Sequence, residues 1–221
     1  MKINLLKSAI AIGMMATGLT SFAASADEPG TANGEWHHYT GDVKGSRYSS
    51  LDQVNADNFE DLEMVWSFST KNLGTRAEYK LEVTPIMVDG VLYATAGTRR
   101  TAIALDGATG ELMWMHSMRE GLRAGLAPRQ LSGRGLSYWS DGNGDDRVLY
   151  VTTGYKLVAL NAHTGVPINE FGSDGNGILD LKVGAVQGNE VQIDLVTGEI
   201  GLHSTPTIAG DLVIVGSAMK E

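Results

Sequence analysis

The chain has 221 residues, of which 43% are hydrophobic, and its formal net charge at pH 7 is −9. This acidity argues against nucleic acid as a partner, because binding to a phosphate backbone needs a basic surface. The sequence contains no cysteine. Disulfides and cysteine-ligated zinc or iron–sulfur sites are therefore excluded, and a secreted form would be held together by its hydrophobic core.

The first 26 residues have the pattern of a secretory signal peptide. Lys2 and Lys7 form a basic region before an apolar stretch, SAIAIGMMATGL, that is too short for a comfortable membrane span. The small residues Ala24–Ala26 then form an A-x-A cleavage site before Asp27. We expect residues 1–26 to be removed and residues 27–221 to be periplasmic, with an uncleaved N-terminal anchor as the alternative.

Short apolar segments separated by turns follow. Alternation of apolar with small or polar residues predicts four consecutive antiparallel strands: Val83–Val88, Val91–Ala96, Thr101–Asp106 and Glu111–His116. The turn DGATG joins the last two, because an Asx side chain can accept hydrogen bonds from the turn and glycine adopts positive φ. No helix is expected between Leu92 and Trp114.

The same pattern returns further along the chain. RVLYVTTG (Arg147–Gly154), KLVALN (Lys156–Asn161) and NAHTG repeat GVLYATAG, TAIALD and DGATG. Reduced copies occur in Asp194–Ile200 and in Ser204–Ala218. A repeated small antiparallel sheet predicts an all-β fold of the β-propeller type, with a β-sandwich as the alternative.

Two tryptophans occupy similar places in this pattern. Trp114 ends the motif ALDGATGELMW, and Trp66 ends the earlier segment LEMVW. In a propeller, a tryptophan at the end of a strand can pack across to a neighbouring blade. We therefore expect both side chains to join adjacent sheets.

Several of these motifs together resemble one family. A-x-D-x-x-T-G-x-x-x-W, the opening WHHYTGDVKGSRYSSL from Trp36, EVTP from Glu82 and RGLSYW from Arg134 are similar to motifs of quinoprotein dehydrogenases. These are eight-bladed propellers that bind pyrroloquinoline quinone (PQQ) and calcium. The resemblance covers nearly all of residues 35–221. It implies a partial propeller of about three to four blades, the N-terminal portion of a PQQ-dependent alcohol or glucose dehydrogenase.

The resemblance also implies cofactor-binding residues. PQQ is a flat tricarboxylate, and Arg134 offers a planar guanidinium suited to a carboxylate. Glu82 matches a carboxylate that hydrogen-bonds the cofactor, and His203 and Ser204 stand where the family places small polar contacts. The alternatives are a surface ion pair for Arg134, an exposed strand-edge charge for Glu82 and a purely structural His203.

Other positions bear on metal and substrate. Glu221 aligns with a calcium-ligating glutamate of the family, although calcium needs several oxygen ligands. Pro128 and Arg129 stand where many alcohol-oxidising members have paired cysteines. Members that oxidise glucose also lack those cysteines, which favours a sugar or polyol substrate. The catalytic aspartate of the family is expected beyond residue 221.

The sequence therefore predicts part of a periplasmic PQQ-dependent dehydrogenase that oxidises an alcohol, polyol or sugar hydroxyl. The electron acceptor would be a quinone or a cytochrome c, and the fragment alone should be inactive. The first alternative is a non-catalytic periplasmic propeller that serves as an assembly scaffold. Such scaffolds are typically lipoproteins, whereas this chain has no cysteine to carry lipid. The second alternative is a sugar-binding propeller.

Overall fold

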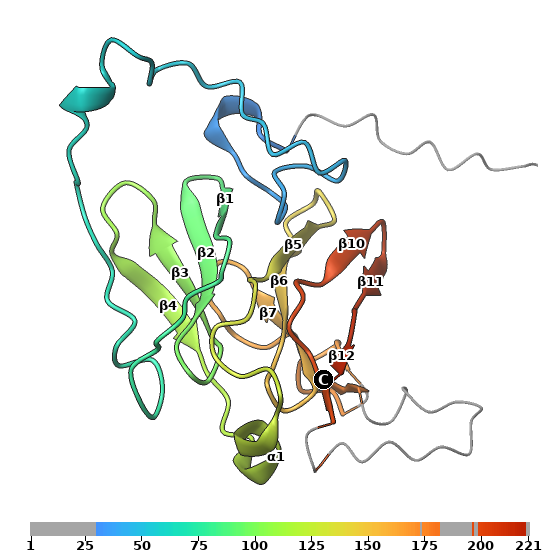
Figure 1. The fold of residues 1–221 in the computed structure, drawn as a ribbon. Helices are drawn as coiled ribbons and strands as arrows, with labels where there is room; N and C mark the ends of the chain where they lie inside the picture. The colour runs from blue at the N-terminus through green and yellow to red at the C-terminus, as the bar shows by residue number, and fades with distance from the viewer. Residues whose placement is uncertain (1–29, 173, 182–195, 197–198, 220–221) are drawn as a thin grey trace, which may run out of the picture.

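The computed structural model describes residues 30–172, 174–181, 196 and 199–219, and it consists mainly of antiparallel sheets (Figure 1). The first sheet contains β1 (Ile86–Val88), β2 (Val91–Ala96), β3 (Thr101–Asp106) and β4 (Leu112–His116). The second contains β5 (Ser137–Ser140), β6 (Asp146–Val151), β7 (Lys156–Asn161) and β8 (Ile178–Asp180). In both, neighbours in sequence are neighbours in the sheet.

The remaining elements are short. They are the strand pair β10 (Thr207–Ala209) and β11 (Leu212–Ile214), the pair β9 (Ile200–Gly201) and β12 (Ala218–Met219), helix α1 (Gly121–Leu126), and 3-10 turns at Ala32–Gly34 and Phe59–Asp61. No helix within the described ranges is long and apolar enough to cross a membrane.

The four strands predicted for the first repeat are confirmed, and no helix interrupts Leu92–Trp114. The first strand begins at Ile86 rather than Val83, because the Thr84 amide donates its hydrogen bond to the Arg134 carbonyl oxygen, 3.1 Å away, outside the sheet. The second repeat and the β10–β11 hairpin also follow the prediction. The reduced copy at 194–200 lies mostly outside the described residues.

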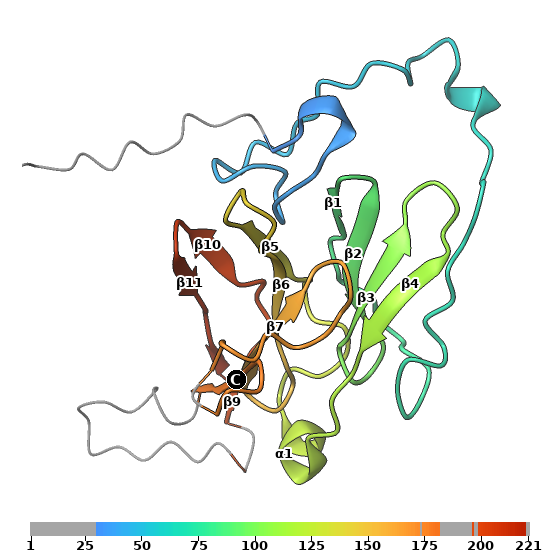
Figure 2. The same cartoon turned by 180° about the vertical axis from the view of Figure 1, so that it is seen from behind.

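The sheets stack face against face, and the hydrophobic core lies between them. One buried cluster joins the two four-stranded sheets and includes Tyr93 and Val148. A second cluster, which includes Leu157 and Leu202, joins the second sheet to the C-terminal strands. A third covers the other face of the first sheet with Trp66. Because successive strand residues point to opposite faces, each central sheet contributes to two clusters. These layers are the blades of a partial propeller (Figures 1 and 2).

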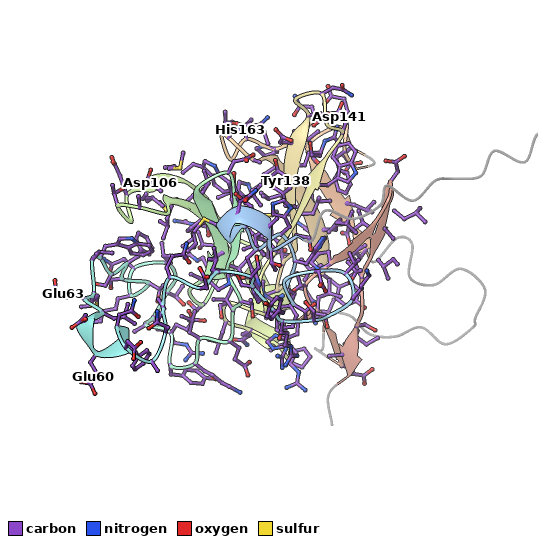
Figure 3. The ribbon with its side chains drawn as sticks, turned by 90° about the horizontal axis from the view of Figure 1, so that it is seen from above. Glu60, Glu63, Asp106, Tyr138, Asp141 and His163 are labelled. Carbon is purple, nitrogen blue, oxygen red and sulfur yellow. The ribbon has the colours of Figure 1, made fainter. Side chains whose placement is uncertain are left out.

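The repeated turns have the same hydrogen bonds in both blades. Asp106 Oδ1 accepts from the amides of Ala108 and Thr109 and from the Thr109 hydroxyl, at 2.7–3.0 Å. Asn161 Oδ1 accepts the three corresponding bonds at 3.0–3.1 Å. Figure 3 shows Asp106 and the turn residue His163 on the two separate sheets.

The tryptophans join neighbouring layers through these turns. Trp114 Nε1 donates to the Ala162 carbonyl oxygen at 2.8 Å, and a Cβ atom placed on Gly165 would lie 2.6 Å from the Trp114 ring. Trp66 Nε1 likewise donates to the Gly107 carbonyl oxygen at 3.2 Å, and the Trp66 ring packs on Gly110 of the same turn. Glycine is required there both for its positive φ and for the contact with the indole.

The N-terminal arm, residues 43–65, runs outside the sheets as a long arc (Figures 1 and 2). It exposes many large apolar side chains: Val43, Tyr48, Leu51, Val54, Phe59, Leu62, Met64 and Val65. Before the arm, Trp36 forms two backbone hydrogen bonds with Met87, so the chain pairs briefly with the free edge of β1.

Candidate functional site

Backbone hydrogen bonds bring three of the predicted motifs together. The Thr84 amide donates to the Arg134 carbonyl oxygen at 3.1 Å, and the Arg134 amide donates to the His203 carbonyl oxygen at 3.2 Å. Arg134 is thus fixed between the EVTP segment and the segment that begins at His203. These three segments, which are far apart in sequence, therefore lie side by side. Each of them directly precedes a strand of the first blade, the second blade or the C-terminal hairpin.

Glu82 accepts from two cationic or polar neighbours. Its Oε1 lies 3.0 Å from Lys80 Nζ, and its Oε2 lies 3.2 Å from His203 Nε2. The hydrogen bond from Lys80 contributes most to lowering the pKa of Glu82, and the positive charges of Lys80 and Arg134 act in the same direction. Glu82 is therefore ionised at neutral pH.

His203 is half-buried beside Glu82. Burial is the main reason that its pKa is lowered, and the positive charges of Arg100 and Arg134 outweigh the opposing effect of Glu82. A neutral ring places its proton on Nε2, facing the carboxylate, which leaves Nδ1 as an acceptor. Nδ1 is buried and has no hydrogen-bond partner within the described structure.

This lowered pKa predicts a pH-dependent stability. Unfolding returns His203 to its ordinary pKa of 6.5, so the unfolded chain binds more protons just below that pH. The free energy of unfolding should therefore decrease as the pH falls from 7 towards 5. His116, whose pKa is also lowered by burial, contributes with the same sign. Replacing both histidines with glutamine should flatten the unfolding temperature over this range; an unchanged slope would contradict the assignment.

The four predicted cofactor residues line two adjoining clefts. Glu82 and His203 lie in a polar cleft of about 330 Å³. Arg134 and Ser204 lie in a wider cleft of about 700 Å³, where Arg134 Nη1 donates to the Tyr39 hydroxyl at 3.2 Å. His203 and Ser204 are consecutive residues facing different clefts, and the Arg134 backbone lies between the two. The structure thus gathers the four residues without placing them in one cavity.

The smaller cleft also contains cations that sequence reasoning missed. Arg76, Lys80 and Arg129 line it, and Arg76 stacks over the Tyr79 ring at 5.2 Å. In a chain of net charge −9, such a concentration of positive charge is distinctive. In the sequence, the only sign of this cluster was that Lys80 and Glu82 alternate just before the predicted strand Val83–Val88. Cations beside an aromatic ring fit a flat polycarboxylate such as PQQ.

The predicted calcium ligand cannot be placed relative to these clefts. Glu221 is outside the described residues. Within the described ranges, no group of three or more His, Cys, Asp or Glu side chains could hold a metal ion. The polar sequence DGNGD (Asp141–Asp145) forms the β5–β6 loop, where Asp141 Oδ1 accepts from the amides of Asn143 and Asp145 (Figure 3 shows Asp141 at this loop).

Four-stranded up-and-down sheets joined through tryptophans define a β-propeller, and a cleft rich in cationic side chains lies beside them. Residues 36–221 match the family described as PQQ: Glucose/ethanol/alcohol dehydrogenase, beta-propeller domain. The chain belongs to this family.

Individual relatives support the same family assignment. The quinoprotein glucose dehydrogenase of Gluconobacter oxydans (strain 621H) is 30% identical over 90% of this chain and 25% of its own length. Methanol dehydrogenase [cytochrome c] subunit 1 of Methylobacterium organophilum is 30% identical over 80% of this chain and 25% of its own length. The crystal structure of quinohemoprotein alcohol dehydrogenase from Comamonas testosteroni has the same fold, with a TM-score of 0.64 and 23% identity over 86% of this chain and 24% of that one. The chain spans about a quarter of each relative.

Proposed function

We propose that this chain is the N-terminal part of a periplasmic PQQ-dependent dehydrogenase that oxidises an alcohol, polyol or sugar hydroxyl. The observation that carries the proposal is the cleft in which Glu82 and His203 are paired among three cations. An acidic propeller of the PQQ family that concentrates positive charge at one cleft is suited to an anionic cofactor.

The roles of individual residues follow from their chemistry. Lys80 and Arg129 would offset carboxylate charge on the cofactor, and Glu82 would accept a hydrogen bond from it. His203 would hold Glu82 in place through Nε2, and Arg134 and Ser204 would contact the cofactor from the adjoining cleft. Bound PQQ would supply the two-electron oxidant, with calcium as a Lewis acid. Glu221 is the candidate calcium ligand in this chain.

The names of the relatives support the substrate class. They include a glucose dehydrogenase, alcohol dehydrogenases and a quinate/shikimate dehydrogenase, all of which act on C–OH groups. Two acceptor types also occur in those names, a quinone and cytochrome c. Either could accept electrons from this protein.

An activity assay tests the proposed reaction. The whole natural protein that contains this sequence should reduce an artificial electron-accepting dye with an alcohol or sugar only when PQQ and calcium are both supplied. The isolated 221-residue chain should show little turnover, because the catalytic base and most calcium ligands are expected outside it. Robust turnover by the isolated chain would place the site elsewhere, and a whole protein that is inactive with every alcohol and sugar would favour a scaffold.

Secretion tests the proposed location. The basic residues, apolar stretch and A-x-A site of residues 1–26 occur in the order of a signal peptide. Export from a Gram-negative host should therefore yield a protein that begins at Asp27. Mass spectrometry of the periplasmic fraction measures this N-terminus. A periplasmic protein that retains Met1 would indicate an anchor instead.

A further inference from the structure

Among the described residues, Arg100 is the largest side chain that is fully buried, and it lies next to the candidate site. It is 1% exposed and immediately precedes β3. Its guanidinium donates to four backbone carbonyl oxygens, those of Arg129 (3.0 Å), Leu131 (3.2 Å), Val151 (3.2 Å) and Leu202 (2.7 Å). A planar guanidinium with several fixed donors can hold separate chain segments at a set spacing.

The charge of Arg100 is not matched by an ion pair. Among the described residues, no carboxylate lies within 4.0 Å of it. Glu120 attracts it electrostatically, but the oxygens of Glu120 accept from Thr152 Oγ1 at 2.6 Å and from the Gly154 amide at 2.8 Å. Burial lowers the pKa of Arg100 to about 10, so the side chain remains charged at neutral pH. A buried, unpaired cation is costly and needs an explanation.

The backbone around Arg100 is also strained. Arg100 itself has φ of 52°, and Leu131, whose carbonyl oxygen it binds, has φ of 67°. Gly133 passes so close that an added Cβ would lie 2.7 Å from Arg100 Nε. Residues other than glycine hold left-handed conformations only where surrounding structure fixes them, and such strain concentrates at ligand sites.

The four hydrogen bonds end mainly at the walls of the cationic cleft. Arg129 and Leu131 line that cleft, and Leu202 directly precedes His203, which also lines it. We propose that Arg100 is a positioning residue for the anionic cofactor. Its guanidinium holds the segment Arg129–Leu131, on one side of the cleft, at a fixed distance from the segment Leu202–His203 on the other side. Its positive charge, which has no carboxylate partner among the described residues, lies beneath both segments. This inference rests on the proposed binding of PQQ.

Two substitutions in the whole natural protein test this role. Arg100→Met removes the charge and the donors, so the two cleft walls are no longer held at their spacing and PQQ affinity should fall about ten- to a hundredfold. The pKa of His203, measured by NMR of labelled histidine without PQQ, should rise, because one of the cations that face His203 is gone while Glu82 and Arg134 remain. Arg100→Lys keeps the charge without the guanidinium geometry. It should leave that pKa close to its original value and lower PQQ affinity by about three- to tenfold.

Arg123→Met is the matched control. Arg123 is also buried and also donates to a backbone carbonyl, that of Ile200, but it does not line the cleft. This variant should lose stability while PQQ affinity stays within about threefold. If Arg100→Met does not fold, Arg100→Lys decides the question by its affinity.

The outcomes separate the two proposals. A wild-type protein that does not bind PQQ would overturn the proposed function, whereas the pKa of His203 still measures the charge of Arg100. Wild-type binding with unchanged affinity in the Arg100 variants would overturn only the positioning role. An unchanged pKa of His203 in Arg100→Met would also overturn the positioning role, because the charge of Arg100 would then have no electrostatic effect at the cleft.

Discussion

Replacing Trp114 with alanine should lower the free energy of unfolding by about 3–5 kcal/mol, the usual cost of deleting a buried tryptophan. The side chain is 9% exposed and belongs to the cluster that joins the two four-stranded sheets. Its indole nitrogen also donates to the Ala162 carbonyl oxygen of the second blade at 2.8 Å. The substitution removes apolar contact and a hydrogen bond together, so the packing between the two blades is weakened at this edge. Urea unfolding of the whole protein measures the change.

Trp114→Phe is the control for this experiment. Phenylalanine keeps most of the apolar contact and loses the Nε1 hydrogen bond, which contributes about 1 kcal/mol, in addition to a small loss of volume. Its effect should therefore be clearly smaller than that of alanine. If Trp114→Ala changed the free energy of unfolding by less than about 1 kcal/mol, packing of Trp114 on the neighbouring blade would not stabilise the fold.

A second large effect is expected at Arg134. Arg134→Ala should weaken PQQ binding about ten- to a hundredfold, because one charge-assisted contact to a carboxylate contributes about 1.5–3 kcal/mol. Arg134 is exposed, and within the described structure no carboxylate lies within 4.0 Å of it. Its guanidinium donates to the Tyr39 hydroxyl and forms no ion pair there, so its charge remains for a ligand. Titration of the whole protein with PQQ measures the change.

Arg147→Ala provides the matched comparison. Arg147 is held by two hydrogen bonds to Asp145 and stacks over the Trp139 ring at 5.1 Å, on the hairpin away from the cationic cleft. Its loss should leave PQQ affinity nearly unchanged. Equal affinities for the two alanine variants would mean that the side chain of Arg134 does not contact the cofactor.

The sheets could be predicted because their signals are local. Alternating residues in β3 and β4 and the Asp106 turn between them determine a hairpin without reference to the rest of the chain. The packing of Trp114 on the next blade followed from the repeat of the same motif. The late start of β1 was not predictable in this way, because it depends on a hydrogen bond between Thr84 and Arg134.

The site was less accessible to sequence reasoning, since its parts come together only in three dimensions. Family resemblance identified Glu82 and His203, but nothing in the sequence showed that they would form a pair. Arg100 looked like an ordinary residue in a turn, because the four carbonyls it binds lie 29 to 102 residues away in sequence. Local patterns do not report such contacts.

Direct binding of PQQ tests the central claim. Calorimetric titration of the whole natural protein with PQQ in the presence of calcium should show saturable binding of one equivalent, weakened in Arg134→Ala and unchanged in Arg147→Ala. Because the cofactor is a tricarboxylate held by cations, this affinity should also decrease as salt is added. Absence of saturable binding in a folded protein supplied with calcium would contradict the account and leave a propeller of this family without its cofactor.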